Sequence, residues 1–288
     1  MTRLLPALLL YPALLLAGIP EEELAADTSA ETAPTSEALM QDRSESLTRW
    51  QQQETDLQRS LPANQLRWLE FDQQRWLGLF LPAMQPEPRG GVLLVSDAGQ
   101  HADSPALNGP ARRLLSEAGW HTLAIALPEL PAQPADNPEA SLQLFGEWMQ
   151  SAQARISHSL SSLQAEGAQW HALIGDGRSA WLLVDSLERS ALAADALVLH
   201  RMHAPSQNVE RIALPQDQSF PILDLLISGN QTTARQRQLE ARRLGLGEYQ
   251  QLEIPEPMLN PLAREVTLKR LSGWLQRQQQ IAAQRNPR

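Results

Sequence analysis

The chain has 288 residues, 42% of them hydrophobic, which is enough for one sizeable folded domain. Its formal net charge of −9 argues against a nucleic-acid partner, because such binding draws on basic residues that neutralise phosphate. The chain has no cysteine, which excludes disulfides, thiolate metal ligands and a cysteine nucleophile.

Residues 1–19 have the pattern of a secretory signal peptide. Arg3 precedes an apolar run that ends at Ile19 and is shorter than the roughly 20 residues of a membrane span. This predicts a periplasmic or secreted protein. The small residues expected at a cleavage site are poorly matched, so an alternative stays open. The segment would then be an uncleaved anchor in the inner membrane, with the rest of the chain facing the periplasm.

Residues 20–60 form a polar leader, rich in Glu, Asp, Ser, Thr, Gln and Ala. This composition buries little apolar surface, so we predict a disordered or partly helical leader, with helix from about Ser36 to Arg59. The folded domain is predicted to occupy residues 61–288. It begins with two imperfectly alternating segments, 65–72 and 75–82, which predict a β-hairpin.

Beyond the hairpin, short apolar runs alternate with segments of helical spacing. The runs have the length and composition of strands buried on both faces of a parallel sheet. The predicted strands are 91–95, 121–127, 169–174, 196–200, 221–227 and 249–254, and the predicted helices are 106–119, 139–166, one from Ser179, 232–244 and 261–283. The polar stretch between 200 and 221 has room for a short helix. The fold class is therefore α/β, a mostly parallel eight-stranded sheet with an N-terminal antiparallel hairpin and helices on both faces.

This order of elements resembles the α/β-hydrolase superfamily from Leu61 to Ala283. Within it, five short stretches resemble an uncharacterised family of exported bacterial proteins, a domain of unknown function. They are Phe80-Leu81-Pro82-Ala83, Asp97-Ala98-Gly99-Gln100-His101-Ala102-Asp103-Ser104-Pro105, Gly119-Trp120-His121-Thr122-Leu123, Gly175-Asp176-Gly177 and Gly273-Trp274-Leu275. The resemblance implies an architecture and no particular activity.

Hydrolases of this superfamily carry their nucleophile on a strand–turn–helix elbow with the pattern G-x-S-x-G. On that pattern the elbow Gly175-Asp176-Gly177-Arg178-Ser179 is degenerate, because Gly177 falls on the serine and offers no side chain. Two alternatives stay open. Ser179, in the first helical turn, is one candidate nucleophile. A shifted register would put Asp176 at the tip, as in members that use a carboxylate nucleophile.

The acid and the base of a triad are also missing where this fold needs them. After strand 221–227 come Ser228-Gly229-Asn230-Gln231, with amides in place of a carboxylate. Asp224 inside the strand is interpreted as a buried, hydrogen-bonded carboxylate or as one that points to an edge of the sheet. No histidine follows His203 in the sequence. The ordinary Ser-His-acid mechanism is therefore not expected.

The loop after strand 91–95 places polar side chains at the carboxyl end of the sheet, where open α/β folds bind ligands. The candidate cleft-lining residues are Ser96, Asp97, Gln100, His101 and Asp103. Of these, Asp97, His101 and Asp103 are expected to converge with Asp176. We interpret this cluster as side chains that hydrogen-bond the loop backbone and tie two loops together, rather than as metal ligands. His200 and His203 form a His-x-x-His pair, which is also interpreted as a surface pair, so no metal or cofactor is predicted.

The sequence therefore predicts an exported α/β-hydrolase-like protein that lacks the usual triad and acts by binding or interaction in the cell envelope. The expected partner is a small molecule or an envelope protein, with membrane contact only through an uncleaved N-terminal segment. The alternative is a hydrolase with a rearranged site that uses Asp176 or Ser179 with His101. It requires these side chains within about a hydrogen bond or one water of each other.

Overall fold

The computed structural model describes residues 51–132, 137–189, 192–204, 214–216, 220–228, 231–254 and 260–285. Residues 1–19, most of the polar leader, most of the stretch between 200 and 221 with room for a short helix, and the triad position Asn230 lie outside these described residues. No helix within the described ranges is long and apolar enough to cross a membrane.

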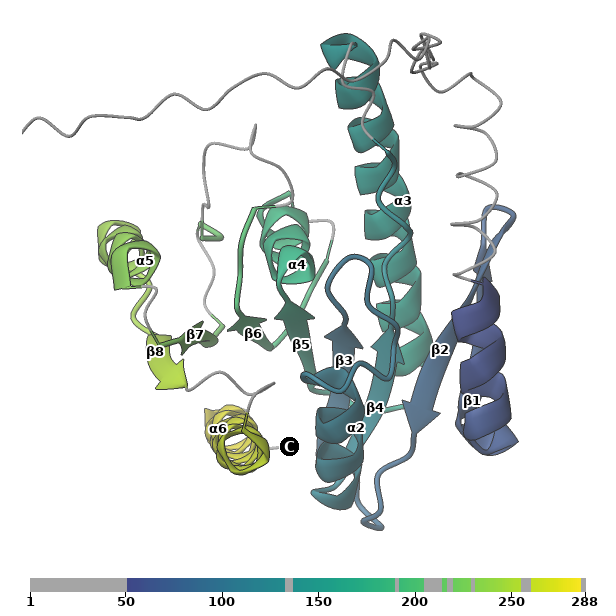
Figure 1. Cartoon of the computed structure of the whole chain (residues 1–288). Coiled ribbons are helices and arrows are strands. Elements are labelled where there is room, and N and C mark those ends of the chain that lie inside the picture. Colours follow the sequence, from purple (N-terminus) through teal and green to yellow (C-terminus); the bar gives the residue numbers. More distant parts are fainter. Residues whose placement is uncertain are drawn as a thin grey trace, which may run out of the picture. The chain divides into compact units, whose positions relative to one another are not determined.

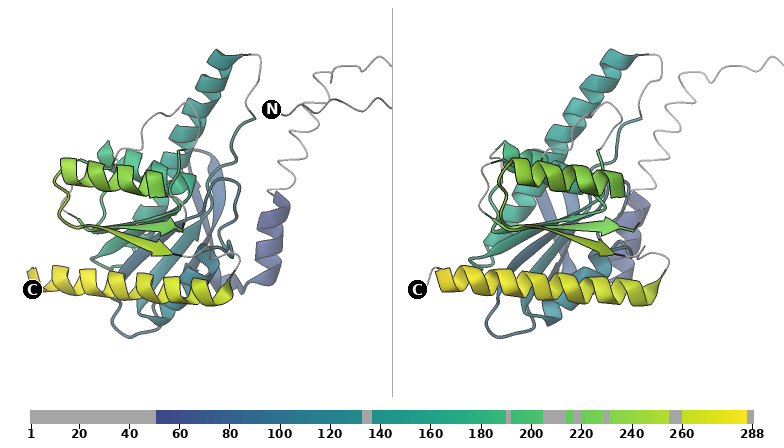
Figure 2. Two further views of the ribbon diagram at one scale, coloured as in Figure 1. Left: turned by 60° about the vertical axis from the view of Figure 1, so that its left-hand side comes forward. Right: turned by 90° about the vertical axis from the view of Figure 1, so that its left-hand side faces the viewer.

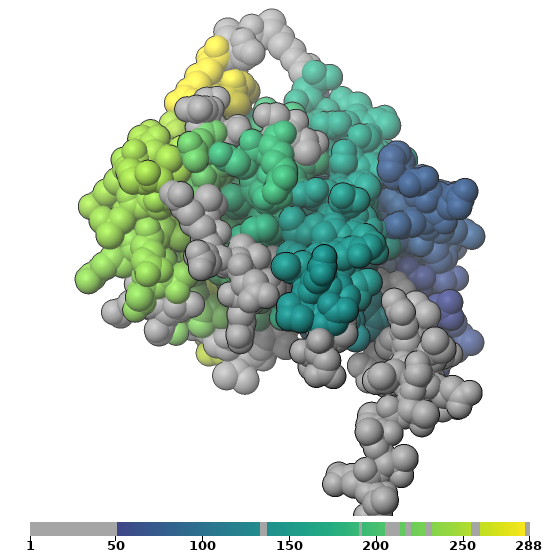
Figure 3. Space-filling model, turned by 90° about the horizontal axis from the view of Figure 1, so that it is seen from above, coloured from purple at the N-terminus to yellow at the C-terminus, as the bar shows by residue number. Residues whose placement is uncertain are grey.

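Eight strands form one sheet in the order β1-β2-β4-β3-β5-β6-β7-β8 (Figure 1). They are β1 (Leu66–Phe71), β2 (Gln74–Leu81), β3 (Gly90–Val95), β4 (Trp120–Ile125), β5 (His171–Asp176), β6 (Ala196–His200), β7 (Ile222–Ile227) and β8 (Tyr249–Ile254). The β1–β2 and β2–β4 pairs are antiparallel and all other pairs are parallel. Figure 3 shows the two edges of this arrangement, with the hairpin in blue and the β7–β8 part in light green on opposite sides. The predicted fold class is confirmed.

Helices cover both faces of the sheet (Figure 2). They are α2 (Asn108–Glu117), α3 (Pro138–Gln164), α4 (Arg178–Glu188), α5 (Gln231–Arg243) and α6 (Pro261–Arg285). Side chains of α2 and α6 pack with Val92 and Val198 on one face, and side chains of α3, α4 and α5 pack with Leu93 and Leu197 on the other. Burial on both faces explains why strands β3 and β5 are buried at every position.

A short N-terminal helix over residues 51–60 belongs to the folded domain. Leu57 packs against the core cluster on the α2 and α6 face, and the Glu54 carboxylate accepts a hydrogen bond from the Leu77 backbone N–H at 3.4 Å. The packed structure therefore includes residues ahead of Leu61.

The ends of the long helix α3 follow from its sequence. The Asn137 side chain accepts a hydrogen bond from the Ala140 N–H at 3.0 Å, and Pro138 stands in the first turn, where its missing N–H costs nothing. Gly167 follows the helix with a φ of 87°, a left-handed conformation that favours glycine.

Strand β5 ends later than its apolar run predicts. Gly175 still pairs with Val95 and Leu199, and Asp176 pairs with His200, so only Gly177 makes the turn into α4. A Cβ on Gly175 would lie 2.5 Å from the Ala180 Cα, so the glycine lets α4 pack closely on the strand. The shifted register is therefore wrong, because Asp176 is the last residue of the strand rather than the tip of the turn.

Candidate functional site

The turn between β5 and α4 has the shape of a nucleophile elbow. Gly177 adopts φ 61° and ψ −120°, a region that strains any residue with a side chain. Its N–H donates to the His200 carbonyl at 2.8 Å, which fixes the turn against the neighbouring strand. Hydrolases of this fold place their nucleophile on such a strained turn. Here the turn is retained, and the residue at its tip has no side chain.

Ser179 lies in the first turn of α4 and is fully buried. Its hydroxyl accepts a hydrogen bond from the Asp176 N–H at 2.8 Å and lies 2.7 Å from the Val95 carbonyl oxygen, to which it can donate. The hydroxyl therefore ties β3, β5 and α4 together. An attack on a substrate would first require these hydrogen bonds to break.

Asp176 is buried at the end of β5 and forms an ion pair with Arg201. The Arg201 Nε and Nη2 atoms donate to its two carboxylate oxygens at 2.9 and 2.7 Å. Burial alone would raise the pKa of Asp176, but the hydrogen bonds and charges of His200 and Arg201 outweigh it and lower the pKa to about 2. This carboxylate is therefore ionised, and both of its oxygens accept hydrogen bonds from Arg201.

His200 is the partner of Asp176 that the sequence reasoning missed. Its Nδ1 lies 2.8 Å from the Asp176 carboxylate, which makes an acid–imidazole pair of the kind found in triads. The imidazole is fully buried, and its Nε2 has no hydrogen-bond partner in the described part of the chain. A usable signal was present, since both residues end neighbouring parallel strands and pair in register. The imidazole is therefore enclosed by the chain rather than exposed at the turn.

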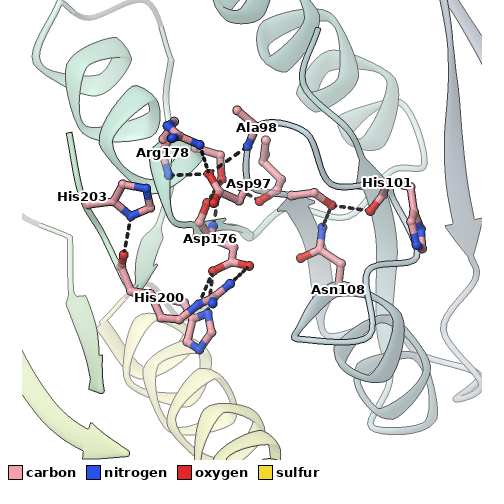
Figure 4. Close-up of polar contacts among 12 residues, drawn as sticks. Asp97, Ala98, His101, Asn108, Asp176, Arg178, His200 and His203 are labelled. Carbon is pink, nitrogen blue, oxygen red and sulfur yellow. Dashed lines mark hydrogen bonds and ion pairs between the residues drawn. The ribbon is translucent and has the colours of Figure 1, made fainter. Parts of the chain in front are cut away.

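Asp97 reaches over the elbow from the loop after β3 (Figure 4). One of its carboxylate oxygens, Oδ1, accepts hydrogen bonds from the Ala98 N–H at 2.8 Å and the Arg178 N–H at 2.9 Å. In α/β-hydrolases the N–H after the nucleophile and an N–H from the loop after the third strand form the oxyanion hole. Both equivalent donors are occupied here by a carboxylate of the chain itself.

The remaining loop residues do not line a shared cleft. Ser96 is buried, donates its hydroxyl hydrogen to the His101 carbonyl at 2.8 Å and accepts from the Asn108 amide at 2.7 Å. Asp103 pairs with the buried Arg112 at 3.1 Å, and Gln100 is exposed. The loop folds back onto the start of α2, so these side chains brace the loop rather than form a pocket with Asp97.

His101 points away from Asp97 and Asp176 (Figure 4). It lines a small space of about 10 Å³ beside Glu54 and Leu57 of the N-terminal helix, which is too small for a ligand. Among the described residues, the His101 Nδ1 is buried without a hydrogen-bond partner, so it bonds neither Ser179 nor Asp176. The structure therefore does not assemble the rearranged site, because the imidazole is packed under the N-terminal helix.

The His-x-x-His pair is also separated. His200 is buried against Asp176, whereas His203 is exposed and its Nδ1 lies 3.1 Å from the Arg201 carbonyl oxygen. Within the described ranges, no three His, Asp or Glu side chains are grouped so that they could hold a metal ion.

Asp224 lies inside β7 and is fully buried. The Arg237 guanidinium donates to both its oxygens at 2.7 and 3.1 Å, the Tyr249 hydroxyl donates at 2.6 Å, and Gln251 lies at 3.3 Å. Burial and the Asp224 charge raise the pKa of Tyr249. Asp224 is therefore a buried, hydrogen-bonded carboxylate rather than one that points to an edge of the sheet. Its hydrogen bonds join β7, β8 and α5.

An open pocket of about 660 Å³ lies at the opposite ends of the strands, near the starts of β5, β6, β7 and β8. Its lining includes Trp170, Leu187, Phe220, Ile281, Asp195 and Arg285. No residue of the elbow or of the loop after β3 lines this pocket, so it is separate from the elbow site.

Several solved structures with a similar fold are named as hydrolases. The chain resembles a dienelactone hydrolase from Anabaena variabilis with a TM-score of 0.51 and 17% identity, over 74% of this chain and 98% of that chain. It resembles esterase 2 of Thermogutta terrifontis, phosphonylated by cyclosarin, with a TM-score of 0.54 and 14% identity, over 75% and 94%. It also resembles a soluble variant of monoglyceride lipase from Saccharomyces cerevisiae, with a TM-score of 0.50 and 10% identity, over 74% of this chain and 95% of that chain. At these identities the likeness shows the fold alone.

Among curated proteins, none matches the chain. The family described as protein of unknown function DUF3530 matches residues 4–144 and 145–277, which together make up most of the sequence. The eight-stranded sheet, its strand order and its hydrolase neighbours agree with the architecture implied by the sequence. The chain belongs to the DUF3530 family and has the fold of the α/β-hydrolase superfamily.

Proposed function

We propose that this protein is an α/β-hydrolase-like protein without Ser-His-acid turnover, and that it acts by binding a small molecule or a protein partner in the cell envelope. One observation carries the proposal. The tip of the elbow is Gly177, which keeps the strained backbone of the turn and has no atom that can attack a carbonyl. Loss of the nucleophile in a serine hydrolase costs on the order of 10⁶ in turnover.

The polar side chains near the elbow support this proposal, because each of them is already hydrogen-bonded to another part of the chain. The Ser179 hydroxyl bonds the backbone of β3 and β5, and the Asp176 carboxylate holds Arg201 and His200. Asp97 already occupies the two backbone donors that would stabilise an oxyanion. A substrate carbonyl would therefore meet a carboxylate at the point where the mechanism needs positive electrostatic potential.

The alternative of a rearranged hydrolase has less support. His101 faces the N-terminal helix, and both Asp176 and Ser179 are buried and hydrogen-bonded. The hydrolase activities of the similar structures are the reason to test for ester cleavage, since a shared fold hosts many functions.

The test is hydrolysis of short-chain 4-nitrophenyl esters by the wild type, Ser179→Ala and Ser116→Ala. Ser116 is a matched control, because its buried hydroxyl also donates to a backbone carbonyl, that of Pro82 at 2.6 Å, away from the elbow. We expect all three proteins to give the rate of the buffer alone. A wild-type rate above the buffer that Ser179→Ala abolishes and Ser116→Ala keeps would overturn the proposal.

The envelope location rests on the basic start and apolar run of residues 1–19. Fractionation of bacteria that express the full chain, followed by mass spectrometry of its N-terminus, tests this location. We expect the protein in the periplasmic fluid or the medium with the segment removed. Recovery from the inner membrane with the segment intact supports the anchored form. Full-length protein in the cytosol would contradict both forms.

A further inference from the structure

The open pocket near the starts of β5 to β8 is lined on one side by the last two turns of α6. The helix supplies Gln278, Ile281, Ala282 and Arg285, whose i, i+3, i+4 and i+7 spacing places them on one helical face. Figure 2 shows the C-terminal end of α6, in yellow, on the side where β7 and β8 begin. The volume of about 660 Å³ lies in the range of roughly 300–1,000 Å³ that is typical of small-molecule sites.

Much of the remaining lining consists of residues that stand directly ahead of four strands. They are Trp170 before β5, Asp195 before β6, Pro221 before β7 and Glu248 before β8. Because these four strands are parallel neighbours, their amino ends meet at one end of the sheet and bring the four residues together. The pocket is therefore built on the frame of the sheet and on α6 rather than on a single loop.

Two polar side chains of the lining are almost fully buried and lack a partner. Gln278 is 5% exposed and Trp170 is 7% exposed. Neither the Gln278 amide nor the Trp170 indole N–H forms a hydrogen bond among the residues that the structure describes. Buried polar side chains in folded proteins are in large majority hydrogen-bonded. A ligand in the pocket can supply the partners that the chain does not.

The charged groups of the lining leave one carboxylate without a cation. Glu248 pairs with Arg285 at 3.2 Å, so these two charges compensate each other. The Asp195 carboxylate accepts the His171 backbone N–H at 2.7 Å, but it forms no ion pair within the described ranges. The lining therefore carries a net negative charge at Asp195, which attracts a positively charged group.

We propose that this pocket binds a small organic amine with an aromatic or branched aliphatic body. The ammonium group pairs with the Asp195 carboxylate, and the Gln278 amide forms a hydrogen bond with the ligand. The apolar body packs against Trp170, Phe220 and Ile281. The inference goes beyond the proposed function, because none of the lining residues belongs to the elbow and binding here does not depend on whether the elbow cleaves esters.

The test is an NMR titration of the full chain with tryptamine, following the Trp170 indole N–H and the Gln278 side-chain amide. Neutral tryptophol and anionic indole-3-propionate carry the same ring and isolate the effect of the charge. We expect saturable shifts with tryptamine, and half-saturation at concentrations at least about five-fold higher with either analogue. The proposal is overturned if tryptamine gives no saturable shift, or if the analogues bind as tightly as tryptamine.

Two variants, followed at the Trp170 indole N–H, place the binding in this pocket. Asp195→Asn keeps an oxygen for the His171 N–H but removes the charge, and Gln278→Leu keeps the bulk but removes the amide. Each should raise the tryptamine concentration at half-saturation at least about five-fold. Asp185→Asn is the control and should bind like the wild type, because Asp185 accepts a hydrogen bond from Gln153 outside this lining. Wild-type affinity in either folded variant would overturn the proposal.

Discussion

Two carboxylates buried in the same sheet show how differently this fold uses one chemical group. Asp224 in β7 is surrounded by Arg237, Tyr249 and Gln251, which donate to it from α5 and β8. Asp176 at the end of β5 is paired with Arg201 and with an imidazole that keeps one nitrogen without a partner among the described residues. The first carboxylate is enclosed in a complete network, whereas the second lies where hydrolases keep strained and reactive groups.

The difference extends to the backbone. Near Asp176, Arg201 has a φ of 52° and Gly177 has a φ of 61°, and both lie in the left-handed region. None of the described residues of β7 or β8 has a positive φ. The elbow therefore keeps the strained shape that catalysis needs in related folds, although the side chain that would use the strain is absent. The β7 region contributes stability without strain.

The largest expected effect comes from breaking the network in β7. Asp224→Ala leaves the Arg237 guanidinium, 3% exposed, without its carboxylate. An uncompensated buried charge costs about 3–5 kcal/mol, to be measured by urea unfolding. Asp185→Ala is the control, since its partner Arg189 is largely exposed and the pair should contribute less than about 1 kcal/mol. Equal losses in the two variants would show that Asp224 is no structural brace.

The second-largest loss of stability is expected at the elbow, where it tests whether the turn is strained. Gly177→Ala places a Cβ on a backbone at φ 61° and against Asp97, so we expect a loss of about 3 kcal/mol from strain and steric conflict. Gly146→Ala serves as the control, because it lies within α3 and a Cβ there meets nothing within 4 Å. That change should be neutral or stabilising. A neutral Gly177→Ala would mean that the turn is not strained.

The smallest expected effect is a change in folding stability with pH. The folded pKa of Asp176 is lowered to about 2, so its stabilising contribution is present above its ordinary pKa near 3.8 and is lost as the pH falls toward 2. Between pH 5 and pH 3 this removes about 1 kcal/mol from the wild type. Asp176→Asn has no such carboxylate, so the stability difference between the two proteins should narrow by that amount on acidification. A constant difference would contradict the low pKa.

The fold was predictable because strands buried on both faces produce apolar runs such as those of β3, β6 and β7. The end of β5 was not predictable in the same way, because Gly175 and Asp176 are not apolar and yet belong to the strand. The glycine gives room for Ala180, and the aspartate is neutralised by Arg201. Periodicity describes burial by apolar contact and does not detect burial by close approach or by ion pairing.

The degenerate tip at Gly177 is readable from the sequence, because the elbow pattern fixes the position of the nucleophile. The position of the Asp97 carboxylate above this turn is not readable from the sequence. Asp97 lies in the loop that the sequence predicts, but its rotamer depends on the space left by Gly177, and its partner Arg178 is far along the chain. The expectation that His101 faces the elbow is wrong, because the loop folds back onto α2 and turns the imidazole toward the N-terminal helix.

The central claim is that the elbow presents no nucleophile, and covalent labelling tests it most directly. The wild-type protein is incubated with an excess of a fluorophosphonate reagent or a 4-nitrophenyl ester and its intact mass is measured. We predict an unmodified mass under conditions that fully label a serine hydrolase. A stoichiometric adduct mapped by peptide sequencing to Ser179 or to Asp97 would contradict this claim.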